Sequence, residues 1–141
     1  MITINDFIYS ETAIKHNIDN TISDEHYLNC VGTIAMLNML EQKIGKKFII
    51  TSGYRCSELN KRVGGVPNSD HTKGLACDIV VVGVTSRDLC HMIIESGIPF
   101  NKIINEFDRW VHIAFSTDVN KRQVMHAKKV NGKTQYLLGV E

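Results

Sequence analysis

The sequence predicts an α+β fold, with a mainly antiparallel sheet and helices packed on it. Three observations indicate this fold: apolar residues recur at helical spacing over residues 24–45, short apolar runs typical of strands follow, and an Asn-Gly turn signal lies near the C-terminus. At 141 residues the chain has the size of one ordinary domain. We therefore expect a single domain over residues 1–141.

Two helices are expected in the first third of the chain. Ser10 is a capping residue for a short helix that ends near Asn17, and Ser23 opens a longer helix that Gly45 ends. The longer helix is interpreted as scaffold, because residues that recur at helical spacing give it one face to bury. The residues of that face are Tyr27, Cys30, Val31, Ile34, Leu37, Leu40 and Ile44.

A strand and a long loop are expected next. The run KFIITSG, residues 47–53, is typical of a buried strand. The segment YRCSELNKRVGGVPNSDH, residues 54–71, is rich in turn formers and is expected to be a loop. Loops of this length often carry functional residues.

The second half of the chain contains the strands of the expected sheet. ACDIVVV, residues 76–82, predicts a central strand, and TSRDLCHMIIES, residues 85–96, predicts a helix that a capping box opens. NKIINEF, residues 101–107, and WVHIAF, residues 110–115, predict two strands joined by a tight turn. AKKVNGKTQYLL, residues 127–138, predicts a hairpin with an Asn-Gly turn.

The charge balance argues against nucleic acid or a membrane as the partner. Sixteen basic and fifteen acidic side chains leave a formal net charge of +1, too little for a long-range field. No apolar run approaches membrane-spanning length, and the first residues lack the cationic start and apolar core of a signal peptide. We expect a monomer that is made in the cytoplasm.

The cysteines and four of the histidines are expected to be structural or exposed. No C-x-x-C pair occurs, so a thiolate zinc site is not expected, and the cysteines are interpreted as reduced and mostly buried. The residues concerned are Cys30, Cys56, Cys77, Cys90, His16, His26, His91 and His126.

Three side chains form a candidate metal site. His71 ends the long loop, Asp78 lies in the strand that follows Gly74, and His112 lies in a later strand. A hydrolytic zinc site needs three nitrogen or oxygen ligands and an open position for water, and these residues can meet that need. Cys77 is a poor ligand candidate, because side chains alternate along a strand. The spacing alone leaves another interpretation open, in which a polar loop enters a strand and His112 is a structural histidine.

Hydrolysis also requires a general base beside the metal. A two-residue turn between the last two predicted sheet strands would direct Glu106 to the wrong face. A three-residue turn, residues 107–109, would pair Glu106 with Trp110 and bring its carboxylate to the side of His112. Glu106 is the candidate base on that condition, and Asp108 is the alternative.

Four segments, taken together, resemble one known family. They are SGYRC (52–56), LNKRVGG (59–65), NSDHTKGLACDI (68–79) and WVHIAF (110–115). Their order and spacing are similar to those of the zinc D-alanyl-D-alanine carboxypeptidase-like metallopeptidases, which are frequent in bacteriophages and as peptidoglycan-cleaving endolysins. The S-x-H-x-x-G-x-A-x-D core and the W-x-H element are present as Ser69, His71, Gly74, Ala76, Asp78, Trp110 and His112.

The resemblance implies a Hedgehog/D-Ala-D-Ala-peptidase-like fold, and zinc held by His71, Asp78 and His112. It also implies an acidic base shortly before the last histidine. In several relatives that residue lies three positions before the histidine, where this chain has Arg109. The group with the longer turn resembles this chain in having a glutamate at the position of Glu106.

The resemblance further implies substrate-binding residues in the loop. Arg55, the arginine of the SGYR element, is expected to bind substrate and to help stabilise the oxyanion, because its planar fork can grip a carboxylate or a peptide oxygen. Ser69 is a second candidate substrate-binding residue.

The leading functional hypothesis is a zinc peptidase that cuts an amide bond in peptidoglycan peptides, either as a D-Ala-D-Ala carboxypeptidase-like enzyme or as an endolysin endopeptidase. Such an endolysin would accumulate in the host cytoplasm and reach the cell wall after the membrane is breached. The alternative is a non-catalytic, zinc-containing wall-binding or phage structural module. The orientation of Glu106 discriminates between them, because a module without a base beside the metal cannot catalyse the reaction.

Overall fold

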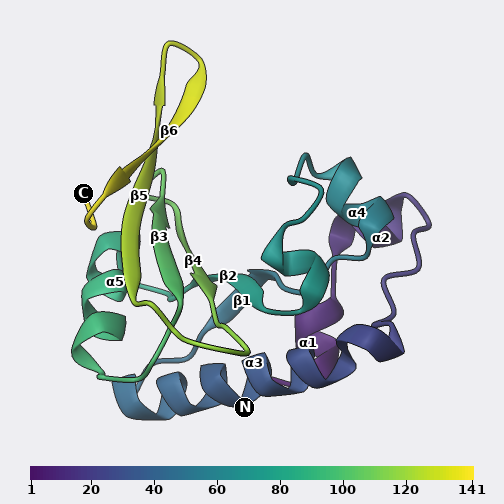
Figure 1. The fold of residues 1–141 in the computed structure, drawn as a ribbon, viewed down its shortest axis with the longest axis horizontal. Coiled ribbons are helices and arrows are strands. Elements are labelled where there is room, and N and C mark those ends of the chain that lie inside the picture. Colours follow the sequence, from purple (N-terminus) through teal and green to yellow (C-terminus); the bar gives the residue numbers. More distant parts are fainter.

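A six-stranded sheet forms the centre of the molecule in a computed structural model, which describes residues 1–141 (Figure 1). The strand order is β1-β2-β4-β3-β5-β6. Its strands are β1 (Ile49–Ser52), β2 (Ala76–Val80), β3 (Lys102–Glu106), β4 (Trp110–Ala114), β5 (Gln123–Val130) and β6 (Lys133–Leu138). All neighbouring strands are antiparallel except β3 and β5, which are parallel. The predicted α+β fold with a mainly antiparallel sheet is therefore confirmed.

Five α-helices and one 3-10 helix accompany the sheet. They are α1 (Ile4–Ile8), α2 (Glu11–Lys15), α3 (Asp24–Ile44), α4 (Ser57–Arg62), η1 (Asp70–Lys73) and α5 (Ser86–Glu95). Helix α1, whose start is fixed by a capping box between Thr3 and Asp6, is not among the elements expected from the sequence. The expected loop over residues 54–71 is wrong in part, because residues 57–62 of it form α4. None of the helices is both long enough and apolar enough to span a membrane.

The hydrophobic core lies between one face of the sheet and the helices α3 and α5. The sheet contributes alternate residues to it, so the residues between them point to the opposite face. The core residues of the sheet are Cys77, Ile79, Ile103, Val111 and Ile113, those of α3 are Cys30, Ile34, Leu37 and Leu40, and those of α5 are Leu89, Cys90 and Ile93. The opposite face remains free for polar side chains.

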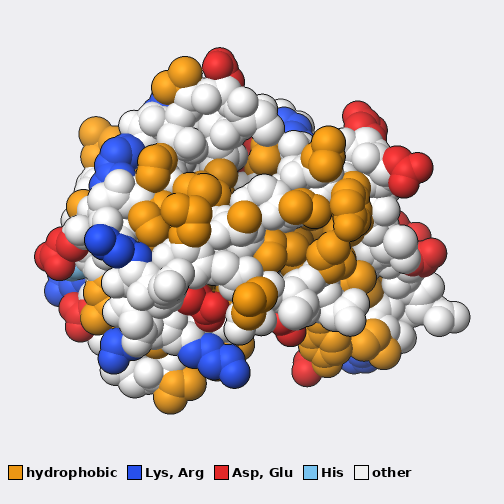
Figure 2. All heavy atoms as spheres, turned by 90° about the horizontal axis from the view of Figure 1, so that it is seen from below, with side chains coloured by type: hydrophobic (Ala, Val, Ile, Leu, Met, Phe, Trp, Pro, Cys, Tyr) orange, Lys and Arg blue, Asp and Glu red, His pale blue; other side chains and the backbone are white.

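The outer side of α3 is partly apolar. Figure 2 shows this side, which is the lower one in Figure 1, with groups of hydrophobic side chains between charged ones. Leu28 and Met39 are exposed there. Tyr27 and Val31 are 47% and 41% exposed, so their predicted burial is wrong, because the partners of α3 cover a narrower stripe than the helical spacing suggests.

The hairpin of β5 and β6 extends beyond the rest of the sheet (Figure 1). Its two-residue turn is formed by Asn131 and Gly132, which have φ angles of 52° and 77°. This conformation is the one that Asn-Gly favours in tight hairpins. The predicted Asn-Gly hairpin is confirmed, although β5 begins earlier than expected.

The four cysteines are free, and three of them are buried. Burial raises the pKa of the Cys90 thiol to about 12 and that of Cys30 to about 11. Both side chains therefore pack as small hydrophobes, in agreement with the prediction of reduced, mostly buried cysteines.

Candidate metal centre

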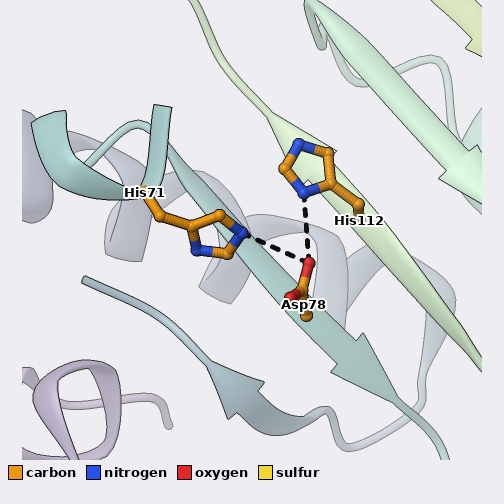
Figure 3. Close-up of side chains that lie close together, drawn as sticks. All are labelled: His71, Asp78 and His112. Carbon is orange, nitrogen blue, oxygen red and sulfur yellow. Dashed lines mark hydrogen bonds and ion pairs between the residues drawn. The ribbon is translucent and has the colours of Figure 1, made fainter. Parts of the chain in front are cut away.

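His71, Asp78 and His112 converge on the free face of the sheet (Figure 3). One ligand atom from each lies within 4.8 Å of the others. Oδ1 of Asp78 is 3.4 Å from Nε2 of His71 and 3.1 Å from Nδ1 of His112. The three residues come from η1, β2 and β4. Two neighbouring elements, η1 and β2, and the more distant strand β4 thus present two nitrogen atoms and one carboxylate oxygen to a common point.

Strand pairing positions two of these residues. Asp78 in β2 is the direct register partner of His112 in β4. Directly opposed residues of antiparallel strands project to the same face with their Cβ atoms about 5 Å apart. Cys77, the neighbour of Asp78, points into the core and is fully buried, as strand alternation predicts.

The local structure of η1 positions His71. The hydroxyl of Ser69 accepts a hydrogen bond from the backbone N–H of His71 and caps the first turn. Nδ1 of His71 lies 2.8 Å from the carbonyl oxygen of Gly53. Because a carbonyl oxygen only accepts, Nδ1 carries a proton, and Nε2 is the nitrogen that faces Asp78 and could bind a metal ion.

Gly74 allows the chain to leave η1 and enter β2. It has a φ of +76°, in the left-handed region, and a Cβ at this position would lie 2.4 Å from Sγ of Cys30. The carbonyl of Gly74 also accepts a 2.7 Å hydrogen bond from the hydroxyl of Thr33. Only glycine satisfies both the conformation and the close approach to α3.

Glu106 lies beside the three candidate ligands. The turn that follows it contains three residues, so Glu106 pairs with Trp110, and it lines a cleft of about 880 Å³ together with His71 and His112. Burial raises the pKa of Glu106; the charge of His112 lowers it, that of Asp78 raises it and that of Arg55 lowers it, and the net direction is upward. A carboxyl group with a raised pKa is suited to proton transfer near neutral pH.

Asp108, the other candidate base, lies elsewhere. It is exposed and accepts a 2.9 Å hydrogen bond from the side-chain amide of Asn105, which precedes Glu106 and points to the opposite face of β3. Asp108 accordingly lines a separate groove between the β3–β4 turn and the C-terminal hairpin. Of the two carboxylates, only Glu106 lines the cleft that contains the candidate ligands.

Arg55 is held at the edge of the same cleft. Its guanidinium donates to Ser52 at 2.9 Å and to the side chain of Asn60 at 3.2 Å, and its Nη2 lies 3.4 Å from Oδ2 of Asp78. Burial lowers the pKa of Arg55, while the charges of Asp78 and Glu106 raise it. The positive charge of Arg55 therefore interacts with the negative charges of both Asp78 and Glu106.

The carboxylate of Asp78 is held in its ionised form. Burial by itself would raise its pKa, but the hydrogen bonds with His112 and His71, and the charges of these histidines, lower it well below the ordinary value. Two imidazole nitrogens and an ionised carboxylate are a donor set that suits zinc, and the open cleft leaves room for a further ligand. The residues present thus fit a divalent metal ion.

The protein belongs to the Peptidase M15 family, whose family model matches residues 1–114. The matched range contains every residue so far described in the cleft, from Arg55 to His112, and ends at the last residue of β4. The chain is thus a member of a family of metal-dependent peptidases. No curated protein matches the sequence.

The sequence does not predict several residues that support the site. Asn60 is 2% exposed, accepts from Arg55 and donates to the carbonyl of Val66 at 2.7 Å. Asn20 donates to the carbonyl of Tyr54, next to Arg55. What distinguishes both asparagines is that their side-chain amides are buried within polar segments. The sequence of such a segment does not show which of its residues are buried. The Gly53 carbonyl has no side-chain signal at all.

Proposed function

We propose that this protein is a zinc-dependent peptidase that hydrolyses an amide bond in peptidoglycan peptides, with Glu106 as its general base. The observation that carries the proposal is the position of Glu106 in the same cleft as His71, Asp78 and His112. Membership of the Peptidase M15 family supports a peptidase reaction. Peptidoglycan as the substrate rests on the resemblance of the sequence motifs to those of the D-alanyl-D-alanine carboxypeptidase-like enzymes.

The proposed roles follow from the chemistry of each side chain. His71, Asp78 and His112 would hold zinc, which supplies a Lewis acid and lowers the pKa of water toward about 7. Glu106 would accept a proton from the attacking water and return it to the leaving nitrogen. Arg55 would orient the peptide and stabilise negative charge on its carbonyl oxygen through its planar fork.

The carbonyl of Gly53 has a supporting role in this proposal. It accepts a hydrogen bond from Nδ1–H of His71, which fixes the tautomer of the imidazole and directs Nε2 toward the site. Residues that orient a ligand in this way increase metal affinity about 10- to 100-fold in zinc enzymes. The backbone carbonyl provides this support without a side chain that a substitution could remove.

A pair of substitutions tests the role of Glu106. The Glu106→Gln protein is expected to hydrolyse purified peptidoglycan about 10²- to 10⁴-fold more slowly than the wild type, because an amide cannot accept the proton. Its zinc content, measured by atomic emission, should stay near that of the wild type. Asp108→Asn is the matched control, since Asp108 lines a different groove, and it should retain activity. Normal hydrolysis by a zinc-loaded Glu106→Gln protein would contradict the role of Glu106.

A further inference from the structure

The β5–β6 hairpin forms one side of the metal cleft. Met125 and Lys129 from β5 and Tyr136 from β6 line the cleft that also contains Glu106 and His112. Both strands lie beyond residues 1–114, the range that the family model matches. This side of the cleft is therefore not part of the matched family sequence.

A row of paired residues connects Glu106 with Tyr136. Glu106 in β3 is the register partner of Ala127 in β5, and Ala127 is the partner of Tyr136 in β6. Paired residues project to the same face of a sheet, so all three side chains point to the cleft side. The side chain of Ala127 is a single methyl group, so Ala127 itself places no large side chain between Glu106 and Tyr136.

Tyr136 is accessible to a ligand and remains a hydrogen-bond donor. Its side chain is 53% exposed. Partial burial, together with the negative charges of Glu106 and Asp78, raises the pKa of its phenol. The hydroxyl is accordingly protonated at neutral pH and can donate to an oxygen atom in the cleft.

The order of the strands determines the order in which the cleft residues lie across the sheet. Arg55 follows β1, Asp78 and His112 lie in β2 and β4, Glu106 lies in β3, and Tyr136 lies in the edge strand β6. Arg55 and Tyr136 thus stand on opposite sides of the candidate metal site. Because a general base returns its proton to the leaving nitrogen, that nitrogen would lie beside Glu106, and the side of Glu106 that faces away from Arg55 is the side of the hairpin.

We propose that Tyr136 is a substrate-binding residue for the amine-side half of the cleaved peptide, where its hydroxyl donates a hydrogen bond to a carboxylate oxygen of the leaving group. The inference rests on the proposed peptidase function. A carboxylate is the acceptor because Lys129 brings a positive charge to this side of the cleft: it pairs with Thr134, two residues from Tyr136 on the same face, and its ammonium donates to the Thr134 hydroxyl at 3.0 Å. The hairpin would then select leaving groups that carry a free acid.

The Tyr136→Phe substitution tests this contact while it retains the aromatic ring. For the stem peptide that the wild type cleaves best, kcat/KM should fall about two- to tenfold, the loss of one hydrogen bond. The inhibition constant of the amine-side product should rise by the same factor, and that of the acyl-side product should not change. A purely structural role would affect both products equally. Tyr27→Phe is the control, because Tyr27 is a half-exposed tyrosine on α3 that does not line the cleft.

A binding measurement separates this inference from the proposed function. Trp110 is the only tryptophan of the chain and lines the cleft, so its fluorescence reports on ligands there. Zinc-loaded Glu106→Gln protein, with and without Tyr136→Phe, would be titrated with two synthetic probes that correspond to the halves of a stem peptide ending in D-Ala-D-Ala: D-alanine as the amine-side product and the stem peptide shortened by one D-alanine as the acyl-side product. Weaker binding of the amine-side product alone supports the Tyr136 contact, even if the wild type cleaves no peptidoglycan bond and the proposed function fails. If both proteins bind the amine-side product with equal affinity, or if neither protein binds it, the proposed Tyr136 contact is contradicted.

Discussion

Asp78 connects all parts of the candidate site. Its Oδ1 contacts both His71 and His112, and its Oδ2 faces Arg55. A single carboxylate therefore orients two candidate ligands and one candidate substrate-binding group. Its ionised state matters for the stability of the metal-free protein as well as for metal binding, since its loss would leave the largely buried guanidinium of Arg55 without its ion-pair partner.

The stability of the metal-free protein should depend on the ionisation of Asp78. The folded-state pKa of Asp78 lies below its unfolded value of about 3.9. Its stabilisation is hence present above that unfolded pKa and is lost as the pH falls through the folded pKa. At neutral pH, Asp78→Asn should lower the free energy of unfolding by roughly 1.5–3 kcal/mol. Urea denaturation from pH 7 down to pH 3 should show this difference shrinking below about pH 4; a constant difference would contradict the account.

The sheet elements follow closely from the sequence, because the alternation of side chains encodes them locally. Cys77 and Ile79 face the core as the alternation predicts. Glu106 is less direct, since its face depends on the length of the following turn, and the sequence leaves two turn lengths open. The structure has the three-residue turn.

Other elements depend on contacts that no local pattern encodes. α4 has only six residues, and it packs against α2 through Leu59, which is buried. The parallel pairing of β3 with β5 depends on the path of the chain after β4, since a strand sequence does not identify its neighbour. For the same reason the sequence does not predict that Tyr136 lines the metal cleft.

The junction between η1 and β2 should be sensitive to substitution. Gly74→Ala would introduce a Cβ 2.4 Å from Sγ of Cys30 in addition to left-handed strain. We expect it to lower the free energy of unfolding by roughly 2–5 kcal/mol, the sum of the conformational and overpacking costs. Urea denaturation of the metal-free protein would measure the loss.

Gly64→Ala is the matched control for this prediction. Gly64 has a φ of +79°, but nothing lies within 4 Å of the added Cβ. It should therefore show only the conformational cost, about 1–2 kcal/mol. Equal losses in the two variants would contradict the prediction, because the close approach of Gly74 to α3 would then add nothing to the conformational cost.

The whole molecule is organised around the contrast between the two faces of its sheet. One face packs on α3 and α5, and the other presents the cleft in which residues of the segment 55–71 meet residues of β2, β3, β4, β5 and β6. The motifs predict which residues belong to the site, because their types and order are local features of the sequence. The distances between these residues follow only from the complete fold. The same holds for the separation of Asp108 from the cleft and for the side of the cleft that the β5–β6 hairpin forms.

Digestion of purified peptidoglycan with metal analysis tests the central claim most directly. Zinc-loaded wild-type protein should release fragments whose masses show newly formed peptide amine and carboxyl ends. A chelator should abolish this release, and added zinc should restore it, because the proposed site requires the metal for hydrolysis. Release that continues in the metal-free protein, or fragments cut only in the glycan strands, would contradict a zinc peptidase built on His71, Asp78, His112 and Glu106.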